Sequence, residues 1–370
     1  MKQKTRNIIF IFVGALVCLI FYGRHNFQED KQILLQLRSR AGNGDVKYVL
    51  DKMEEPNQFS NPIIYLAHFK WKQEMYDRFI TNEEVIENTS GNKMVNDISN
   101  IYRTYWRVQL LNENSETRTD KTLYNNLSDY LIANQLTTLT KDSLLKIIKH
   151  DVELTTILKD QGYKTHFLLR NGFQDVLIWD EETTKNYTVV LPKDTVETKV
   201  IFIESYHLNG YDHYATFGSS SIGGWAIKEA ATLYCNKAEY NLSSEKFEVS
   251  YLKHETIHFT DLNDYPNLSS TDLEYRAKLI ELMYCTKESI YDRVAQFING
   301  SDSTNRQYSH PYANYILIKN LSELVFNTDY ESDHTKWKEI SVEKINNAAV
   351  TLYKTSERLL QKDNSLTEVI

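Results

Sequence analysis

The sequence reads YLKHETIHF over residues 251–259, and this stretch decides which fold we expect for the second half of the chain. It follows Ser243-Ser244-Glu245, which predicts a helix start, because a serine side chain caps free amides and an acid is favourable at the positive end of a helix. His254 and His258 are four residues apart. On a helix they project from one face, one turn above the other, so both imidazoles can reach one metal ion.

The residues between the two histidines add the chemistry of a hydrolase. Zinc is commonly held by neutral imidazoles and a carboxylate, with a fourth position left open for water. Glu255 lies beside the first histidine and is placed to take a proton from such a water, whose pKa the metal lowers. The sequence thus predicts one zinc ion per chain, bound by His254, His258 and a third ligand.

The third ligand has three candidates. Glu274 opens a predicted helix over residues 272–298, while Glu281 would share its helix face and Asp264 follows His258 closely, where a different zinc arrangement places its last ligand. Glu274 also has a purely structural interpretation, because it closes a capping box that begins three residues earlier. We expect Glu274 to be the ligand and keep Asp264 and Glu281 as alternatives.

Composition excludes several other classes of protein. The 370 residues carry Lys+Arg 42 against Asp+Glu 50, a net charge of −8, and an acidic chain is not expected to bind a nucleic-acid backbone. With Cys 3, neither a disulfide scaffold nor a multi-cysteine zinc module is expected. Whether Cys235 and Cys285 pair stays open at this point.

The N-terminus carries a separate signal. Lys2, Lys4 and Arg6 precede an unbroken apolar run over residues 8–22, without small residues that would suit a cleavage site. Residues 1–28 therefore predict an uncleaved signal anchor, a transmembrane helix with its basic flank in the cytoplasm and the rest of the chain extracytoplasmic. The alternative is a cleaved signal and a secreted protein.

The remainder predicts an α+β chain in two parts. Apolar residues recur at helical spacing over residues 29–160, which indicates a mainly helical domain of unknown role whose Tyr and Trp residues form its core. From residue 161 the pattern alternates as in strands, which suggests an antiparallel meander, and it becomes helical again after residue 243. We therefore place the catalytic domain at residues 161–370.

The motif and the helix predicted after it resemble a known group. His254-Glu255-Thr256-Ile257-His258, with Glu274-Tyr275-Arg276-Ala277 further along, is similar to the gluzincins, the thermolysin-like branch of the zincin metallopeptidases. The resemblance covers about residues 245–285. It implies a mixed or antiparallel sheet over an active-site helix, followed by C-terminal helices, with residues 230–235 as the edge strand that holds the substrate. It also implies that His254, His258 and Glu274 bind the zinc and that Glu255 is the general base.

The chain departs from the larger gluzincins in one respect. These often carry an acid one turn after the third ligand, where this chain has Lys278, so another group must support the histidines. Asp261, one turn past His258, is a candidate for that role. The donor for the developing oxyanion stays unassigned between residues 308–312 and the loop that contains His207, Tyr211 and His213.

Taken together, the sequence predicts a membrane-anchored, extracytoplasmic zinc metallopeptidase that acts on a peptide or protein substrate. One alternative is a zincin-like binding or scaffold protein of the cell envelope that no longer cleaves. Another is a purely structural envelope protein whose histidines are incidental.

Overall fold

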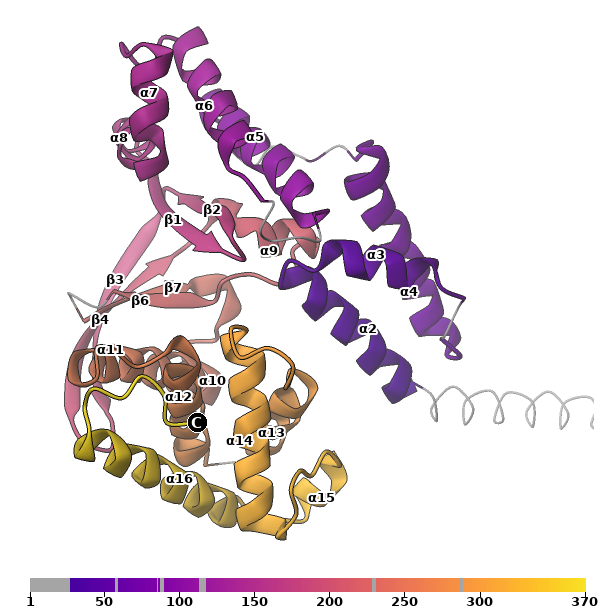
Figure 1. The fold of residues 1–370 in the computed structure, drawn as a ribbon, viewed down its shortest axis with the longest axis vertical. Helices are drawn as coiled ribbons and strands as arrows, with labels where there is room; N and C mark the ends of the chain where they lie inside the picture. The colour runs from indigo at the N-terminus through magenta and orange to yellow at the C-terminus, as the bar shows by residue number, and fades with distance from the viewer. Residues whose placement is uncertain are drawn as a thin grey trace, which may run out of the picture. The chain divides into compact units, whose positions relative to one another are not determined.

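The computed structural model describes residues 27–370 apart from 57–58, 85, 87–89, 113–117, 228–230 and 287–288. It confirms a mixed α+β chain, with many helices and two small sheets (Figure 1). Two compact units make up the chain. The first runs to Trp179 and includes Tyr206–Ser221, and the second holds Asp180–Ser205 and Ile222–Ile370. The units thus exchange segments, where the sequence predicted a single boundary between residues 160 and 161.

The first unit is mainly helical, as predicted, and carries a small antiparallel sheet. The sheet has the order β1-β2-β5 and consists of β1 (Lys164–Arg170), β2 (Phe173–Trp179) and β5 (Tyr206–Asn209). The helices are α2 (Phe27–Gly42), α3 (Val46–Glu54), α4 (Pro62–Tyr76), η1 (Asp77–Thr81), α5 (Lys93–Leu110), α6 (Lys121–Ala133), α7 (Lys141–Ile147), η3 (Ile148–His150), α8 (Val152–Asp160) and α9 (Gly210–Ala215).

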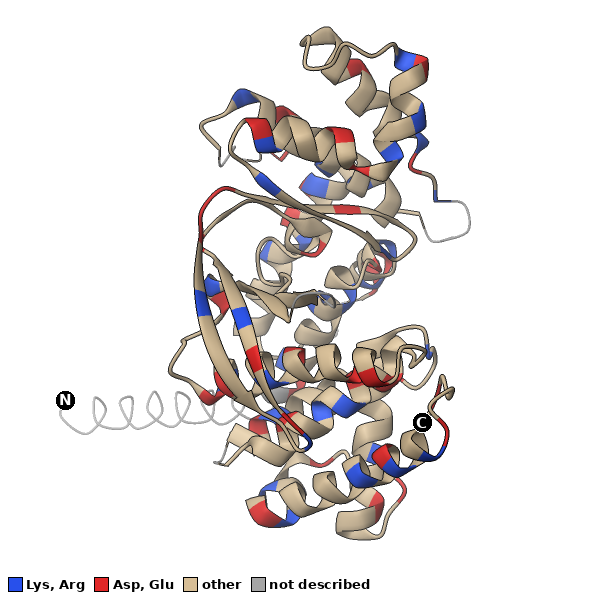
Figure 2. Ribbon diagram, turned by 90° about the vertical axis from the view of Figure 1, so that its left-hand side faces the viewer, with Lys and Arg blue, Asp and Glu red and all other residues tan. Residues whose placement is uncertain are grey.

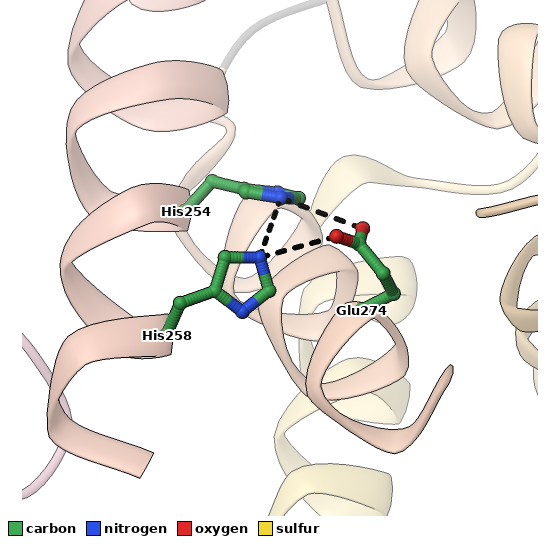
Figure 3. Close-up of side chains that lie close together, drawn as sticks. All are labelled: His254, His258 and Glu274. Atoms are coloured by element: carbon green, nitrogen blue, oxygen red, sulfur yellow. Dashed lines mark hydrogen bonds and ion pairs between the residues drawn. The ribbon is translucent and has the colours of Figure 1, made fainter. Parts of the chain in front are cut away.

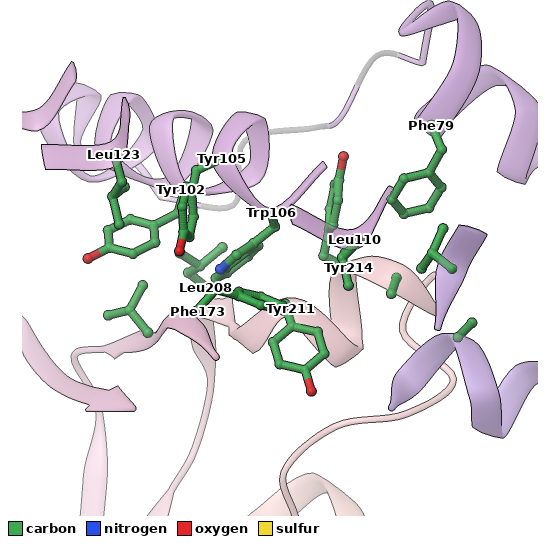
Figure 4. Close-up of a cluster of buried hydrophobic side chains, with 14 of the residues drawn as sticks. Phe79, Tyr102, Tyr105, Trp106, Leu110, Leu123, Phe173, Leu208, Tyr211 and Tyr214 are labelled. Carbon is green, nitrogen blue, oxygen red and sulfur yellow. The ribbon is translucent and has the colours of Figure 1, made fainter. Parts of the chain in front are cut away.

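The core of the first unit is rich in aromatic side chains (Figure 4). Trp106 on α5 is fully buried, and its indole N–H donates to the carbonyl of Gln174 at 3.0 Å. The rings of Phe173 and Tyr211 pack with centroids 4.9 Å apart. Aromatic pairs at such distances stabilise a core beyond their buried area. The prediction that these aromatic residues are structural is confirmed for Tyr102, Tyr105 and Trp106.

The second unit has a mixed sheet with the order β3-β4-β7-β6. The strands are β3 (Glu182–Val190), β4 (Thr195–Ile203), β6 (Gly224–Ile227) and β7 (Thr232–Asn236), and β4 and β7 run parallel. The predicted meander is therefore split, because its first hairpin joins the other unit. The predicted edge strand is also wrong, since β7 lies between β4 and β6 and the edge beside it is β6.

Helices complete the second unit after the sheet. They are η4 (Lys237–Glu239), α10 (Glu245–Phe247), η5 (Glu248–Lys253), α11 (His254–Asp264), α12 (Ser270–Tyr284), α13 (Ser289–Asn299), α14 (Ser309–Phe326), α15 (His334–Lys338) and α16 (Val342–Lys362). The single helix predicted over residues 272–298 is thus two helices, α12 and α13. The capping prediction is confirmed, because the Ser244 side chain accepts a hydrogen bond from the amide of Phe247.

No helix in the described part of the chain is long and apolar enough to cross a membrane. Acidic and basic residues are spread along the helices (Figure 2), and the 21-residue helix α16 carries Lys344, Lys354 and Arg358 among others. For the residues that it covers, this finding corrects our prediction of a membrane-anchored chain, because it gives no support to a transmembrane segment. The predicted signal anchor itself falls almost wholly on residues 1–26, which lie outside the described residues.

A buried guanidinium joins three helices of the second unit. Arg276 on α12 has no exposed surface and donates to both carboxylate oxygens of Asp261 on α11, at 2.7 and 2.9 Å. It also donates to Glu357 on α16 at 2.8 Å and to the Ser356 hydroxyl at 2.8 Å. A bidentate pair of this kind fixes geometry as well as contributing energy. Arg276 therefore sets the positions of α11, α12 and α16 relative to one another.

Replacing this arginine should destabilise the second unit. Arg276→Met leaves the buried carboxylates of Asp261 and Glu357 without their main counter-charge, which typically costs about 3–5 kcal/mol. Urea denaturation followed by circular dichroism measures the change. Lys336→Met removes an exposed lysine that pairs with Glu331 and should leave the midpoint unchanged. A midpoint for Arg276→Met equal to that of the wild type would show that the network does not hold the helices.

The same network predicts a loss of stability in acid. Burial raises the pKa of Glu357, but hydrogen bonds from Tyr265, Arg276 and Lys193 outweigh it and lower the pKa to about 2. A carboxylate with a lowered folded-state pKa stabilises the fold above its ordinary value of 4.5, and this contribution is lost as the pH falls towards about 2. The free energy of unfolding should therefore decline over that range.

Glu357→Gln should flatten this decline, whereas Glu343→Gln on the exposed face of the same helix should leave it intact. Denaturant titrations at several pH values between 7 and 2 measure the slope. An unchanged slope in Glu357→Gln would assign the acid sensitivity to other groups.

Candidate metal centre

The histidine motif begins at a change of helix type. The segment η5 is a π-helix, and α11 continues from it at His254. Such π segments occur often at functional sites because they rotate the following side chains relative to a regular α-helix. His254 is buried and His258 is partly buried, one turn further along the same face. The prediction that the two imidazoles share one helix face is confirmed.

Three side chains converge at this point (Figure 3). The Nε2 atoms of His254 and His258 are 3.1 Å apart. The Glu274 carboxylate lies 3.3 Å from Nε2 of His258 through Oε1, and 3.6 Å from Nε2 of His254 through Oε2. Among the residues that the structure describes, these three form the one group of at least three His, Cys, Asp or Glu side chains that could hold a metal ion.

The spacing of these atoms fits a zinc ion. Ligands placed tetrahedrally at zinc–nitrogen or zinc–oxygen distances of about 2.0–2.1 Å lie about 3.3 Å from one another. The two nitrogens are 3.1 Å apart, and the nearest contacts to Glu274, 3.3 Å to Oε1 and 3.6 Å to Oε2, lie around that value. Two imidazoles and one carboxylate are also the donor set that catalytic zinc prefers. The residues present therefore suit zinc without rearrangement of the helices.

The structural interpretation of Glu274 does not hold. The cap of α12 is Ser269, whose side chain accepts a hydrogen bond from the amide of Asp272, and not Thr271. The Thr271 hydroxyl donates instead to the carbonyl of Arg306. Glu274 therefore does not cap the helix, and its carboxylate faces the histidines on α11.

Two basic side chains lie against the same carboxylate. His310, at the start of α14, has its Nδ1 atom 2.8 Å from Glu274 Oε2, and the Lys278 ammonium lies 3.3 Å from that oxygen. Burial raises the pKa of Glu274, but the charges of His310 and Lys278 and the contact with His258 outweigh it and hold the pKa well below its usual range. The anionic form of Glu274 is therefore favoured, and this is the form that metal binding would require.

His258 shares in this charge balance. Burial lowers its pKa, but the contact with Glu274 and the charges of Glu274, Glu255 and Asp261 raise it above the ordinary value. The space between the imidazoles and the carboxylate therefore stabilises a bound proton. Because a cation is stabilised there, the same space is favourable for a metal ion.

The other two candidate ligands have different partners. Asp264 forms an ion pair with Lys193 at 2.6 Å, near the turn between β3 and β4. Glu281 is bonded to His254, but through the ring nitrogen Nδ1, which faces away from Glu274. Asp261 pairs with Arg276, so it does not orient the histidines as predicted. Glu274 is thus the candidate that the structure brings to both Nε2 atoms.

The carboxylate of Glu255 is not engaged by a described side chain. Its side chain is partly exposed and forms no hydrogen bond or ion pair with any residue that the structure describes. Burial raises its pKa, an effect that the charges of His254 and His258 oppose. Glu255 follows the first histidine directly on α11, where a carboxylate with a raised pKa is suited to accept and release a proton.

Of the donor candidates for an oxyanion, the structure brings His310 to the triad. His310 belongs to the segment 308–312 and has a largely exposed side chain. His207, Tyr211 and His213 lie on β5 and α9 of the first unit, whereas the motif belongs to the second. Sequence reasoning missed Lys278 as a contact of Glu274, although the spacing of four residues on one helix was a signal for it.

The edge strand β6 lies against the motif helix. It contacts α11 and ends the order of the described sheet. At Gly224 a side chain would collide with the ring of Tyr251 and the carbonyl of Tyr234, so only glycine lets the strand approach η5. The nearby Cys235 is a free, buried thiol, as is Cys285, and the two do not pair.

Comparisons with protein-family models, with curated proteins and with solved structures find no match to this chain. The chemistry of the residues above therefore has to support any functional conclusion by itself.

The geometry predicts which carboxylate completes the site. The full chain should bind one zinc ion, and binding should be lost in His258→Ala and Glu274→Ala because each removes a converging ligand atom. Asp264→Ala removes a carboxylate of the same region that faces Lys193 and should retain the zinc. Metal content after dialysis against buffer with micromolar zinc measures this. Loss of zinc in Asp264→Ala but not in Glu274→Ala would reverse the assignment.

Proposed function

We propose that this chain is a zinc-dependent metallopeptidase whose second unit has a zincin-like arrangement of sheet and active-site helix. The observation that carries the proposal is the convergence of His254, His258 and Glu274 at distances that suit zinc, with the unengaged carboxylate of Glu255 beside them. Two imidazoles and one carboxylate leave a coordination position for water, which distinguishes a catalytic donor set from a closed structural one.

His254, His258 and Glu274 would hold the metal, and Glu255 would move the proton. A zinc ion bound there lowers the pKa of a coordinated water towards 7 and polarises a substrate carbonyl. Glu255 accepts a proton from the attacking water and passes it to the leaving amine. The lack of another described partner for its carboxylate supports this role, because an acid held in an ion pair would resist protonation.

The edge strand supports a peptide as the substrate class. The outer side of β6 has no further strand among the described residues, and β6 lies next to the helix that carries the histidines. An extended peptide can add to such an edge through main-chain hydrogen bonds. A substrate held in this way presents its backbone, and so its scissile carbonyl, towards α11.

His310 is the group that we assign to the developing negative charge. It lies beside Glu274 at the exposed side of the triad, and an imidazolium or neutral N–H donor stabilises an oxyanion. Its contact with Glu274 oxygen Oε2 would be exchanged for one with the substrate oxygen during the reaction.

Glu255→Gln tests the proposed mechanism most directly. The amide cannot accept the proton but has nearly the same shape, so we expect one zinc per chain, an unchanged fold and a cleavage rate lower by about 10²–10⁴-fold. The assay is digestion of a random-sequence peptide library, read by mass spectrometry, with zinc content measured on the same samples. Chelation with 1,10-phenanthroline should abolish cleavage by the wild type, and added zinc should restore it.

Other results would favour other functions. One zinc per chain without cleavage of any peptide would favour a zincin-like binding protein over an enzyme. A wild-type chain without zinc, even after zinc is added, would overturn the metal centre and the peptidase together.

A further inference from the structure

A second buried carboxylate contacts the metal centre from its far side. Glu281 on α12 has 3% of its surface exposed, and its Oε1 atom lies 2.8 Å from Nδ1 of His254. The other ring nitrogen of His254, Nε2, faces Glu274 and His258. The two nitrogens of this imidazole are thus used on opposite sides, one towards the metal site and one towards Glu281.

The position of Glu281 is itself fixed by Arg293. The Arg293 Nε atom on α13 lies 3.1 Å from the second oxygen of Glu281, and its Nη2 group donates to the Ser250 hydroxyl on η5. Ser250 lies one turn before His254 on the continuous helix, and the contacts run as a chain from His254 through Glu281 and Arg293 to Ser250. No sequence pattern indicated the part that Arg293 plays in it.

Charge keeps Glu281 in the form that this contact needs. The ion pair between Arg293 and Oε2 of Glu281 favours the carboxylate form of this side chain. An ionised carboxylate only accepts hydrogen bonds, so the proton of this bond belongs to Nδ1 of His254. The Nε2 atom of a neutral imidazole then carries the lone pair that a metal ion binds.

We propose that Glu281, held in place by Arg293, is the positioning residue of the metal centre: it fixes His254 as the Nδ1–H tautomer with Nε2 aimed at the ion. The proposal rests on the zinc site proposed above and adds to it the group that sets its affinity. Lys278, one turn after Glu274, is cationic and cannot serve in this way, whereas Glu281 lies two turns after Glu274 on the same face of α12.

The test measures zinc affinity and the tautomer separately. Glu281→Gln on the full chain should weaken zinc binding about 10–100-fold in competition with a chromophoric chelator, the usual effect of losing such an outer partner. In the metal-free protein, imidazole ¹⁵N shifts should show that His254 loses its Nδ1–H preference. The matched control Glu343→Gln removes an exposed carboxylate of the same unit and should change neither quantity.

Arg293 provides the second variant, which stays informative if Glu281→Gln does not fold. Arg293→Lys keeps a charge next to Glu281 and should retain part of the affinity, whereas Arg293→Met should lose as much as Glu281→Gln. If the role were purely structural, the variants would lower the unfolding temperature of the metal-free protein but leave the tautomer signal unchanged. The zinc affinities of Arg293→Lys and Arg293→Met would then not differ according to charge.

The outcomes separate this inference from the function on which it rests. Wild-type zinc binding together with unchanged affinity in Glu281→Gln, or in both Arg293 variants, would overturn the positioning role and leave the metal centre intact. A wild type that binds no zinc would overturn both.

Discussion

The geometry of the second unit depends on one buried guanidinium. Arg276 follows Glu274 by two residues on α12, and its partner Asp261 follows His258 by three residues on α11. A shift that separates the two helices would therefore also break a bidentate ion pair. Burying such a pair is expensive, and an apolar replacement often gives equal or greater stability. The free-energy cost of burying this ion pair is consistent with a candidate site whose residues lie on α11 and α12 and need a fixed spacing between these helices.

The candidate metal centre shows how a protein can keep ionisable side chains close together. Glu274 lies against Lys278 and His310, while His254 lies against Glu281, which in turn pairs with Arg293. Each buried carboxylate around the triad thus has a basic side chain against it, Lys278 for Glu274 and Arg293 for Glu281. A buried charge without a partner would shift its pKa until it became neutral, and the ligands would then lose the protonation states that metal binding requires.

The sequence predicts the parts of this site that are local in the chain. The spacing of His254 and His258 fixes their common helix face, and Ser244 caps the preceding helix as expected. The third ligand could only be narrowed to three carboxylates, because the choice depends on how α12 crosses α11. The orienting role was predicted for Asp261 and a possible ligand role for Glu281, and both depend on the same crossing. Asp261 bonds Arg276 instead, and Glu281 contacts Nδ1 of His254.

Long-range pairing limited the prediction of the fold in the same way. The sequence indicated the strands, but it did not show which sheet β1 and β2 join. They belong to the first sheet because β2 pairs with β5, which begins at Tyr206, 27 residues after the end of β2. The strand that lies at the edge, β6, is short and begins with a glycine, so it lacks the alternation by which β4 was recognised.

The exchange of segments between the two units has a consequence for how the protein is made. The three-stranded sheet cannot be completed on the ribosome until β5 emerges, and by then β3 and β4 have already been synthesised. Domains usually fold as units while the chain grows, with the N-terminal one first. Here the edge of β2 stays unpaired until β5 has been synthesised. The edge of β4 likewise stays unpaired until β7 has been synthesised. Neither half can reach its final fold alone, and the nascent chain is exposed to mispairing of strand edges for longer than one with consecutive domains.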